Sequence, residues 1–201
     1  MQIYRGDGCY YGEVAFTISG DKIYNGNGMS SVAYTIYGDK IYNIVKKVSS
    51  ITHAHEISVL GCYIFVRFAM EIISGKYKSI SYENIKKLDY SFFSKQSLEK
   101  YSRILNGNIQ ELNIDEIKSS GYIVDTLEAV FWMFLNGNDY NTTVLKAVNL
   151  GEDTDTVAAI TGGLSGCYYG IESIEINWRR ILKRINYIEK LCVNFYREFC
   201  K

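Results

Sequence analysis

The chain has 201 residues, of which 47% are hydrophobic and 14% aromatic, so it is long enough for one globular domain with a substantial core. Lys plus Arg and Asp plus Glu both number 22, and this zero net charge provides no general attraction to nucleic acid or to an anionic membrane. The five cysteines include no C-x-x-C pair, which disfavours a disulfide framework and a thiolate zinc site. No signal segment opens the chain and no apolar run suits a bilayer span, so we expect a cytoplasmic protein.

The N-terminal quarter contains a near-repeat. Residues 17–25 (TISGDKIYN) recur almost unchanged as residues 35–43 (TIYGDKIYN). Two copies are too few for a solenoid, so the repeat is either a pair of short strands or a local duplication, and we favour the second. Between the copies, residues 25–31 form a glycine-rich turn that is able to present backbone N–H groups to a phosphate, although most such turns bind nothing.

A polar segment at residues 49–56 (SSITHAHE) precedes the first clear helical pattern. It holds the only two histidines, His53 and His55, beside Ser and Thr residues suited to a helix cap. No third histidine and no paired cysteine exists, so zinc ligation is not expected. Two interpretations stay open: a histidine that contacts a ligand, and a histidine of an ordinary capping loop.

Helical periodicity dominates the rest of the chain and predicts helices over residues 57–73, 121–135, 156–170 and 177–198 that pack together. Clear strand alternation is scarce. The third of these helices contains Gly162, Gly163 and Gly166, each of which costs helix stability relative to alanine. We therefore expect these glycines to face a neighbouring helix or a ligand that approaches the backbone closely.

The start of the third helix is the most informative segment. Residues 149–156 (NLGEDTDT) place the carboxylates of Asp153 and Asp155 and the hydroxyl of Thr156 within one helical turn, a grouping of hard oxygen ligands suited to a small divalent cation. The alternative is that Asp153 or Thr154 only caps the helix. Neither is followed three residues later by the Glu or Gln of a capping box. An EF-hand loop is excluded, because Ala158 and Leu164 occupy its glycine and glutamate positions.

Four segments in order resemble the ADP-ribosylglycohydrolase family. They are residues 25–28 (NGNG), 49–55 (SSITHAH), 121–129 (GYIVDTLEA) and 146–156 (KAVNLGEDTDT). The resemblance is strongest from residue 41 to residue 178. It implies an all-α fold, a compact orthogonal helical bundle that is N-terminally truncated here, and a single domain over residues 1–201 in which residues 1–45 are divergent or rearranged.

The resemblance also implies a binuclear metal site for Mg²⁺ or Mn²⁺. In the family the D-x-D-T segment supplies metal ligands, which maps onto Asp153, Asp155 and Thr156, with Asp153 and Asp155 as the catalytic carboxylates. The implied reaction is hydrolysis of the glycosidic bond between ADP-ribose and a modified side chain or small acceptor, with ADP-ribose or an ADP-ribosylated substrate as the partner. The acceptor and the oligomeric state stay open.

The substrate pocket of the family maps onto other segments of this chain. The resemblance places Asn27, Gly28 and His53 along the ADP-ribose pocket. In the segment GYIVDTLEA it places Tyr122 and Asp125 nearest the site, while the remaining residues pack in the core.

The chain departs from the family pattern at its start. Family members open with a helix that bears Gly-Asp-Ala, followed by a Thr-Asp-Asp motif that supplies the other metal ligands; this chain has neither. The implied site therefore holds at most half of its ligands. Two function classes follow: a hydrolase, or a truncated or degenerate remnant that binds ADP-ribose without cleaving it.

Overall fold

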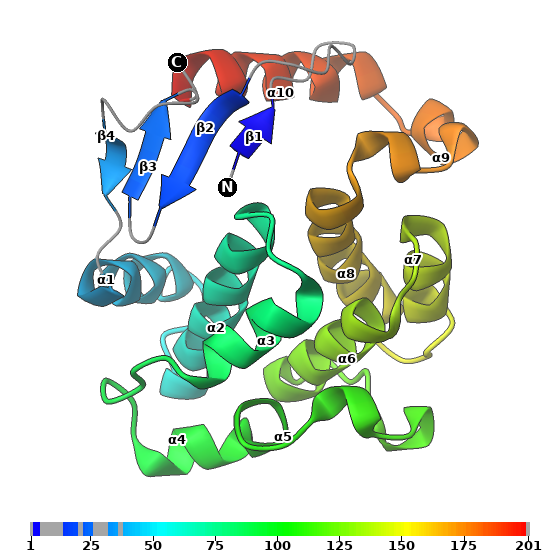
Figure 1. Cartoon of the computed structure of the whole chain (residues 1–201). Helices are drawn as coiled ribbons and strands as arrows, with labels where there is room; N and C mark the ends of the chain where they lie inside the picture. Colours follow the sequence, from blue (N-terminus) through cyan, green and yellow to red (C-terminus); the bar gives the residue numbers. More distant parts are fainter. Residues whose placement is uncertain (1, 5–13, 20–21, 26–31, 36–37, 200–201) are drawn as a thin grey trace. The chain divides into compact units, whose positions relative to one another are not determined.

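The computed structural model describes the backbone of residues 2–4, 14–19, 22–25, 32–35 and 38–199, and the side chains of residues 40–198. The chain forms two compact units, each defined by the contacts among its own residues (Figure 1). One unit comprises Met1–Lys40 with Glu175–Lys201, and the other comprises Ile41–Ile174. No described helix is both long enough and apolar enough to cross a membrane.

The first unit contains a four-stranded antiparallel sheet in the order β1-β2-β3-β4 and two helices. The strands are β1 (Gln2–Tyr4), β2 (Val14–Ser19), β3 (Lys22–Asn25) and β4 (Val32–Thr35). The helices are α9 (Ile176–Ile181) and α10 (Ile185–Phe199). The sequence periodicity did not predict this sheet.

The two copies of the near-repeat take different secondary structures. In the first copy β2 pairs with β3, with Thr17 opposite Tyr24 and Ile18 opposite Ile23. The second copy ends β4 at Thr35 and then begins helix α1 (Gly38–Ser49). The first copy thus forms a pair of short strands and the second does not, while the local duplication stays a prediction. In the second copy Ile41 is buried in the helical unit, and such tertiary burial overrides local preference.

The second unit is entirely helical, which confirms the all-α fold class for the part of the chain that carries the candidate site. Helices α2 (Glu56–Ile73), α6 (Ile123–Asn136) and α8 (Thr154–Tyr169) contact one another, and their bounds agree with the predicted helices to within two residues. The other elements of the unit are α3 (Lys78–Lys86), α4 (Lys95–Lys100), α5 (Ser102–Leu105), α7 (Tyr140–Val148) and the short 3-10 helices η1 (Ile109–Glu111), η2 (Ile114–Glu116) and η3 (Ile171–Ser173).

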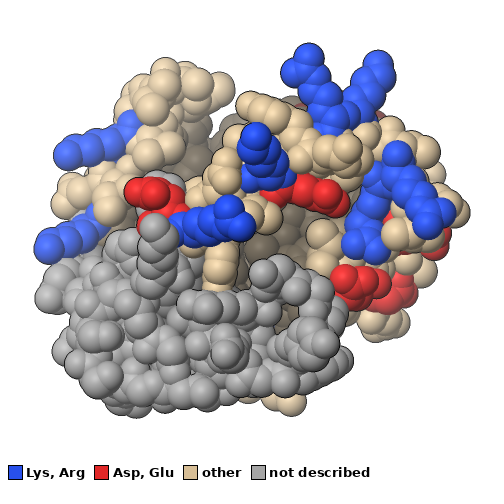
Figure 2. All heavy atoms as spheres, turned by 90° about the horizontal axis from the view of Figure 1, so that it is seen from above, with Lys and Arg blue, Asp and Glu red and all other residues tan. Residues whose placement is uncertain are grey.

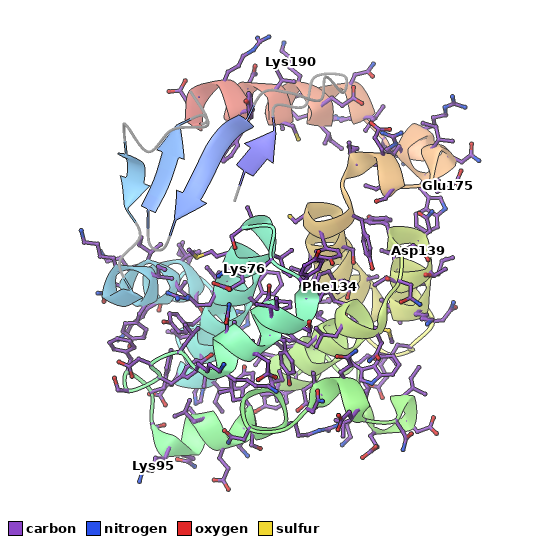
Figure 3. The ribbon with its side chains drawn as sticks, in the orientation of Figure 1. Lys76, Lys95, Phe134, Asp139, Glu175 and Lys190 are labelled. Atoms are coloured by element: carbon purple, nitrogen blue, oxygen red, sulfur yellow. The ribbon has the colours of Figure 1, made fainter. Side chains whose placement is uncertain are left out.

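Aromatic rings form the centre of the helical unit. Phe68 of α2 is fully buried, and its ring centroid lies 4.5 Å from that of Phe131 and 5.7 Å from that of Phe134, both on α6. Phe134 lies among the side chains inside this unit (Figure 3). Offset and edge-to-face ring pairs stabilise packing beyond the area they bury. These rings therefore fix α2 against α6.

The predicted helix over residues 177–198 is wrong as one continuous element. The chain leaves helix α9 at Leu182, which is extended, and Arg184 has a φ of 62° before α10 begins at Ile185. The sequence has no proline or glycine at this break, so apolar periodicity runs through it without a stop signal. A left-handed arginine costs conformational energy that context must offset.

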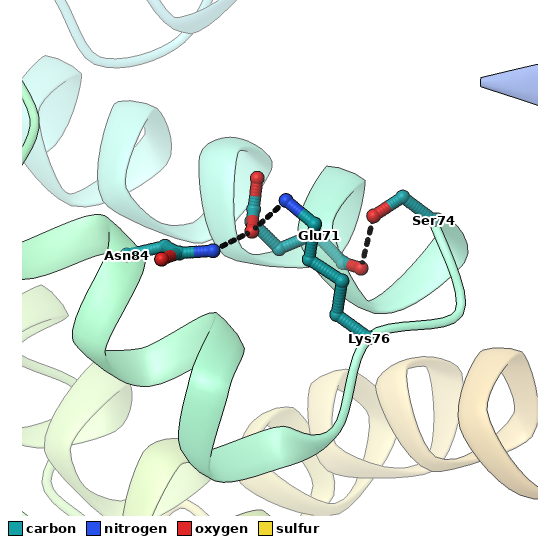
Figure 4. Close-up of polar contacts among 4 residues, drawn as sticks. All are labelled: Glu71, Ser74, Lys76 and Asn84. Carbon is teal, nitrogen blue, oxygen red and sulfur yellow. Dashed lines mark hydrogen bonds and ion pairs between the residues drawn. The ribbon is translucent and has the colours of Figure 1, made fainter. Parts of the chain in front are cut away.

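A hydrogen bond from Asn84 of α3 joins that helix to the end of α2, where Glu71 also bonds to Ser74 and Lys76 of the connecting segment (Figure 4). The Glu71 carboxylate accepts from Lys76 Nζ at 2.7 Å and from Asn84 Nδ2 at 2.5 Å, and Ser74 Oγ donates to the Glu71 carbonyl at 2.6 Å. Elsewhere, acidic and basic side chains are interspersed over the described part of the face in Figure 2.

Two of the three glycines of α8 face a neighbouring helix, as predicted. A Cβ atom on Gly162 would lie 3.4 Å from the Tyr140 hydroxyl oxygen of α7, and one on Gly166 would lie 3.9 Å from the Tyr140 ring. Gly163 does not fit the prediction, because a Cβ atom there would meet no described atom within 4 Å. A methyl group at either position would be in van der Waals contact with Tyr140, so only a larger side chain would have to displace it.

We expect Gly162→Leu to lower the free energy of unfolding by roughly 1–3 kcal/mol, because a side chain there overpacks against Tyr140 and forces α7 away. Gly163→Leu is the matched control: the position is exposed, and leucine forms helix better than glycine by about 1 kcal/mol. Urea denaturation of both variants tests the contact. Equal stabilities would contradict it.

One lysine, Lys78, joins the C-terminal end of α6 to the C-terminal end of α8. Lys78 Nζ of α3 donates to the carbonyls of Phe134 and Gly137 at 2.7 Å each, and to the Tyr169 hydroxyl at 2.6 Å. The same ammonium lies 4.6 Å from the ring centroid of Phe134 and 5.0 Å from that of Tyr168. A cation at the C-terminal carbonyls of a helix also complements the negative end of its dipole. Burial lowers the pKa of Lys78 to about 8.

We expect Lys78→Met to cost about 2 kcal/mol, since charge-assisted hydrogen bonds to two carbonyls are lost. Lys76→Met, which removes only an exposed ion pair, should cost less than about 1 kcal/mol. Because the pKa of Lys78 lies below its unfolded value of 10.5, the unfolded chain holds more protons above pH 8. The stability contributed by this group therefore rises with pH from about 8 towards 10.5.

Urea unfolding at pH 7 and pH 9 measures both effects. The advantage of the wild type over Lys78→Met should be larger at pH 9 than at pH 7. An advantage that shrinks with pH would show that the hydrogen bonds to the charged amine outweigh its desolvation.

Candidate functional site

A pocket of about 480 Å³ in the helical unit gathers residues from three of the sequence segments singled out above. This volume lies in the range of small-molecule sites. Its lining comprises Ser49, Thr52, His53, His55, Ile57, Ser58, Cys62, Gly121, Tyr122, Ile123, Thr126, Asp153, Thr156 and Ile160.

The loop between α1 and α2 forms one wall of the pocket. The His53 N–H donates to the Ser49 carbonyl at 2.7 Å, and the Ser49 hydroxyl donates to the His53 carbonyl at 2.9 Å. His53 Nδ1 lies 3.0 Å from the Thr52 hydroxyl oxygen. The reciprocal bonds with Ser49 fix the backbone of the loop at His53, whose exposed side chain lines the pocket.

The two histidines have different roles. His55 is the N-cap of α2, and its Nδ1 accepts from the Ile57 N–H at 3.2 Å. His53 caps no helix and lines the pocket. The following residue, Glu56, accepts from the hydroxyls of Ser94 and Ser97, and these hydrogen bonds lower its pKa. The capping interpretation therefore applies to His55, and contact of His53 with a ligand stays a prediction.

The segment before α6 forms a second wall. Tyr122 is the N-cap of α6, its side chain makes no capping bond, and it is 44% exposed at the pocket. The Ser120 hydroxyl donates to Asp125 Oδ2 at 2.6 Å and accepts from the Tyr122 N–H at 3.2 Å. Tyr122 is thus where the resemblance predicts it, whereas the Asp125 carboxylate is engaged by Ser120 and does not line the pocket.

Asp153 forms the third wall and does not cap α8 in the usual way. It occupies the N-cap position, but its side chain accepts no backbone N–H of the helix. Instead Oδ1 accepts from the Thr156 hydroxyl at 2.8 Å, and Oδ2 lies on the side of Gly121, 3.6 Å from where a Cβ atom on that glycine would be. The capping interpretation of Asp153 is therefore wrong, and its carboxylate faces the pocket with Thr156.

Three helix N-termini converge on the pocket. The N-cap residues of α2, α6 and α8 are His55, Tyr122 and Asp153, and all three line it. The N-terminal N–H groups of a helix and the positive end of its dipole favour bound anions. The pocket is consequently suited to a ligand with negative charge that also presents hydroxyls to the Asp153 carboxylate.

The structure does not bring all predicted site residues together. Asp155 is exposed in the first turn of α8 and is not among the pocket-lining residues. Asn27 and Gly28 lie outside the described residues. Within the part of the chain that is described, no group of three or more His, Cys, Asp or Glu side chains is arranged to hold a metal ion. The Mg²⁺ or Mn²⁺ site stays a prediction, with Asp153 and Thr156 as the pocket residues that fit it.

Sequence reasoning missed Ser58 and Cys62 of α2 and Ile160 of α8 among the lining residues. Ser58 and Cys62 follow His55 by three and seven residues, and Ile160 follows Thr156 by four. Residues at these spacings share one face of a helix. Extending each motif along its own helix face would have found them.

Comparison with known proteins shows the family of the chain. The sequence profile of the ADP-ribosylglycohydrolase family matches residues 10–201, so the chain belongs to that family. A solved structure described as an ADP-ribosylglycohydrolase-related protein complex superposes with a TM-score of 0.67 at 27% sequence identity. The match covers 78% of this chain and 52% of the other.

Two curated relatives are informative. The chain is 37% identical over 102 residues to the ADP-ribosylarginine hydrolase Tri1 of Pseudomonas putida, which is 50% of this chain and 28% of that protein. It is 27% identical over 130 residues to the ADP-ribosyl-[dinitrogen reductase] glycohydrolase of Rhodospirillum rubrum, which is 64% of this chain and 38% of the relative. The chain thus spans less than two fifths of the length of these two relatives.

We expect Mg²⁺ to raise the melting temperature of the wild type in proportion to the logarithm of its concentration, and Asp153→Asn to abolish the shift. A ligand at 100 times its dissociation constant stabilises by about 2.7 kcal/mol. Asp155→Asn tests whether the exposed carboxylate also binds metal, and Asp115→Asn, at another exposed aspartate, is the control. Equal shifts in all four proteins would show that the metal does not use Asp153.

Proposed function

We propose that this chain carries the substrate pocket of an ADP-ribosyl hydrolase that acts on ADP-ribosylated arginine with the help of Mg²⁺. The observation that carries the proposal is the pair Asp153 and Thr156 facing a pocket where three helix N-termini meet. The name of the relative from Pseudomonas putida supports arginine as the acceptor.

The charges of the pocket suit the two parts of ADP-ribose. The diphosphate would lie at the helix N-termini, where N–H groups and helix dipoles favour anions. The hydroxyls of a ribose would donate to the carboxylate of Asp153, whose Oδ1 is already oriented by Thr156. The exposed Tyr122 ring and the apolar residues Ile57, Ile123 and Ile160 provide surface for the remainder of the ligand.

The proposed reaction adds water to the anomeric carbon of the ribose and breaks the bond from that carbon to the arginine guanidinium nitrogen. The proton of the water is transferred to the leaving nitrogen. Such cleavage passes through an oxocarbenium-like state, which a carboxylate close to the ribose stabilises. Bound Mg²⁺ would supply orientation of the ribose hydroxyls and activation of water. Asp153, whose carboxylate accepts from the Thr156 hydroxyl, would position the ribose hydroxyls and the water.

The alternative is a domain that binds ADP-ribose without cleaving it. One carboxylate and one hydroxyl on the pocket are fewer ligands than a two-metal site needs, and Mg²⁺ prefers a near-octahedral shell. A misplaced catalytic group costs orders of magnitude in rate. The described residues therefore favour binding more strongly than they favour fast hydrolysis.

We expect the 201-residue chain to bind ADP-ribose and to release ADP-ribose from an ADP-ribosylated arginine peptide very slowly or not at all. Calorimetry measures binding, and chromatography of the released ADP-ribose with Mg²⁺ present measures cleavage. Asp153→Asn should abolish any release, and a matched serine peptide should be cleaved less. Tyr122→Ala and His53→Ala should weaken binding.

The outcomes separate the two function classes. Release by the wild type that Asp153→Asn abolishes supports the hydrolase. Binding without release supports the ADP-ribose-binding alternative. A wild type that neither binds nor cleaves would overturn both, and robust release that survives in Asp153→Asn would show that other acids carry the reaction.

A further inference from the structure

The turn that leads into Asp153 has an unusual backbone. Gly151 has a φ of 98° and Glu152 a φ of 52°, so two consecutive residues lie in the left-handed region. A residue with a Cβ atom is disfavoured there, and Glu152 is one of two such residues in the described part of the chain. Some contact outside the turn must hold this conformation.

Ser119 makes that contact from a different segment of the chain. Its hydroxyl donates to the Gly151 carbonyl at 2.6 Å, and its own carbonyl accepts from the Asp153 N–H at 3.0 Å. Ser119 is 2% exposed. One buried residue therefore holds the turn on both sides of Glu152.

An aspartate at a helix start usually accepts from the N–H groups of its own first turn. Asp153 does not, although it occupies the N-cap position of α8. The turn held by Ser119 keeps the carboxylate facing Thr156 and the pocket instead. Releasing the turn would allow Asp153 to relax into an ordinary cap, which stabilises the helix while it removes the carboxylate from the pocket.

We propose that Ser119 is the positioning residue that keeps Asp153 at the pocket by holding the left-handed turn Gly151–Glu152. This inference rests on the proposed function for its effect on catalysis, but its structural part can be tested without metal or substrate. It predicts that loss of the Ser119 hydroxyl impairs the pocket more than it lowers stability, because a relaxed Asp153 would still cap α8.

The test compares Ser119→Ala with Ser81→Ala and Ser119→Thr. Ser81 is also fully buried, but its hydroxyl has no hydrogen-bond partner in the described part of the chain, so Ser81→Ala controls for loss of a buried hydroxyl alone. Ser119→Thr retains the hydroxyl and should restore the wild-type behaviour.

The first measurement is amide hydrogen exchange of Asp153 by NMR in the absence of metal. Exchange should be about tenfold or more faster in Ser119→Ala, unchanged in Ser81→Ala and close to wild type in Ser119→Thr. Unchanged exchange in Ser119→Ala would overturn the inference, whether or not the chain proves to be a hydrolase.

The second measurement is the dependence of the melting temperature on Mg²⁺, together with any release of ADP-ribose. Ser119→Ala should weaken the apparent Mg²⁺ affinity by about 10- to 100-fold, which is the usual effect of mutating a residue that supports a metal ligand. Its melting temperature without metal should stay close to that of the wild type. A lower melting temperature with unchanged Mg²⁺ affinity would show a merely structural role and overturn the inference.

Glu152→Asn provides a second test of whether Ser119 acts through the turn. Asparagine tolerates the left-handed conformation better than glutamate, so the turn should depend less on Ser119. The effect of Ser119→Ala on Asp153 exchange should then be smaller in the Glu152→Asn background. An equal effect in both backgrounds would contradict a role through the turn. A wild type without any Mg²⁺ shift would argue against the proposed function alone.

Discussion

The mutual packing of α2, α6 and α8 is the constraint on which the pocket depends. The rings of Phe68, Phe131 and Phe134 fix α2 against α6, and α8 contacts both helices. Because each of the three helices begins with a residue of a recognisable motif, this packing gathers the motifs at one place. Loss of the aromatic core would separate the walls of the pocket without changing any residue that lines it.

The interactions at the C-terminal ends of these helices differ from those at the N-terminal ends. At their C-terminal ends Lys78 donates to the carbonyls of Phe134 and Gly137 and to the Tyr169 hydroxyl, so α6 and α8 are held by one half-buried amine. At the N-terminal ends the N-cap residues of α2, α6 and α8 line the pocket, and the positive ends of helix dipoles favour anions. Lys78 therefore joins α6 and α8 at one end, while the pocket lies at the other.

Serine hydroxyls that donate to backbone carbonyls stabilise two of the pocket walls. Ser49 donates to the His53 carbonyl, and Ser119 donates to the Gly151 carbonyl. Both serines are buried, while the residues that they position are exposed or half-exposed at the pocket. The pocket is thus lined both by loop residues whose backbone these serines fix and by residues of the first turns of α2, α6 and α8.

The sequence by itself determined the long helices of the helical unit and the placement of His53, Tyr122 and Asp153 near helix starts, because apolar periodicity and capping chemistry are local. Tertiary structure decided the rest. It gave the nearly identical residues 17–25 and 35–43 different structures, a strand pair in the first copy and the end of a strand followed by a helix start in the second, where Ile41 is buried in the helical unit. It also placed the Asp153 carboxylate at the pocket, bonded to the Thr156 hydroxyl and not to the backbone N–H groups of α8, behind a turn that Ser119 holds by a hydrogen bond to Gly151, 32 residues further along the chain.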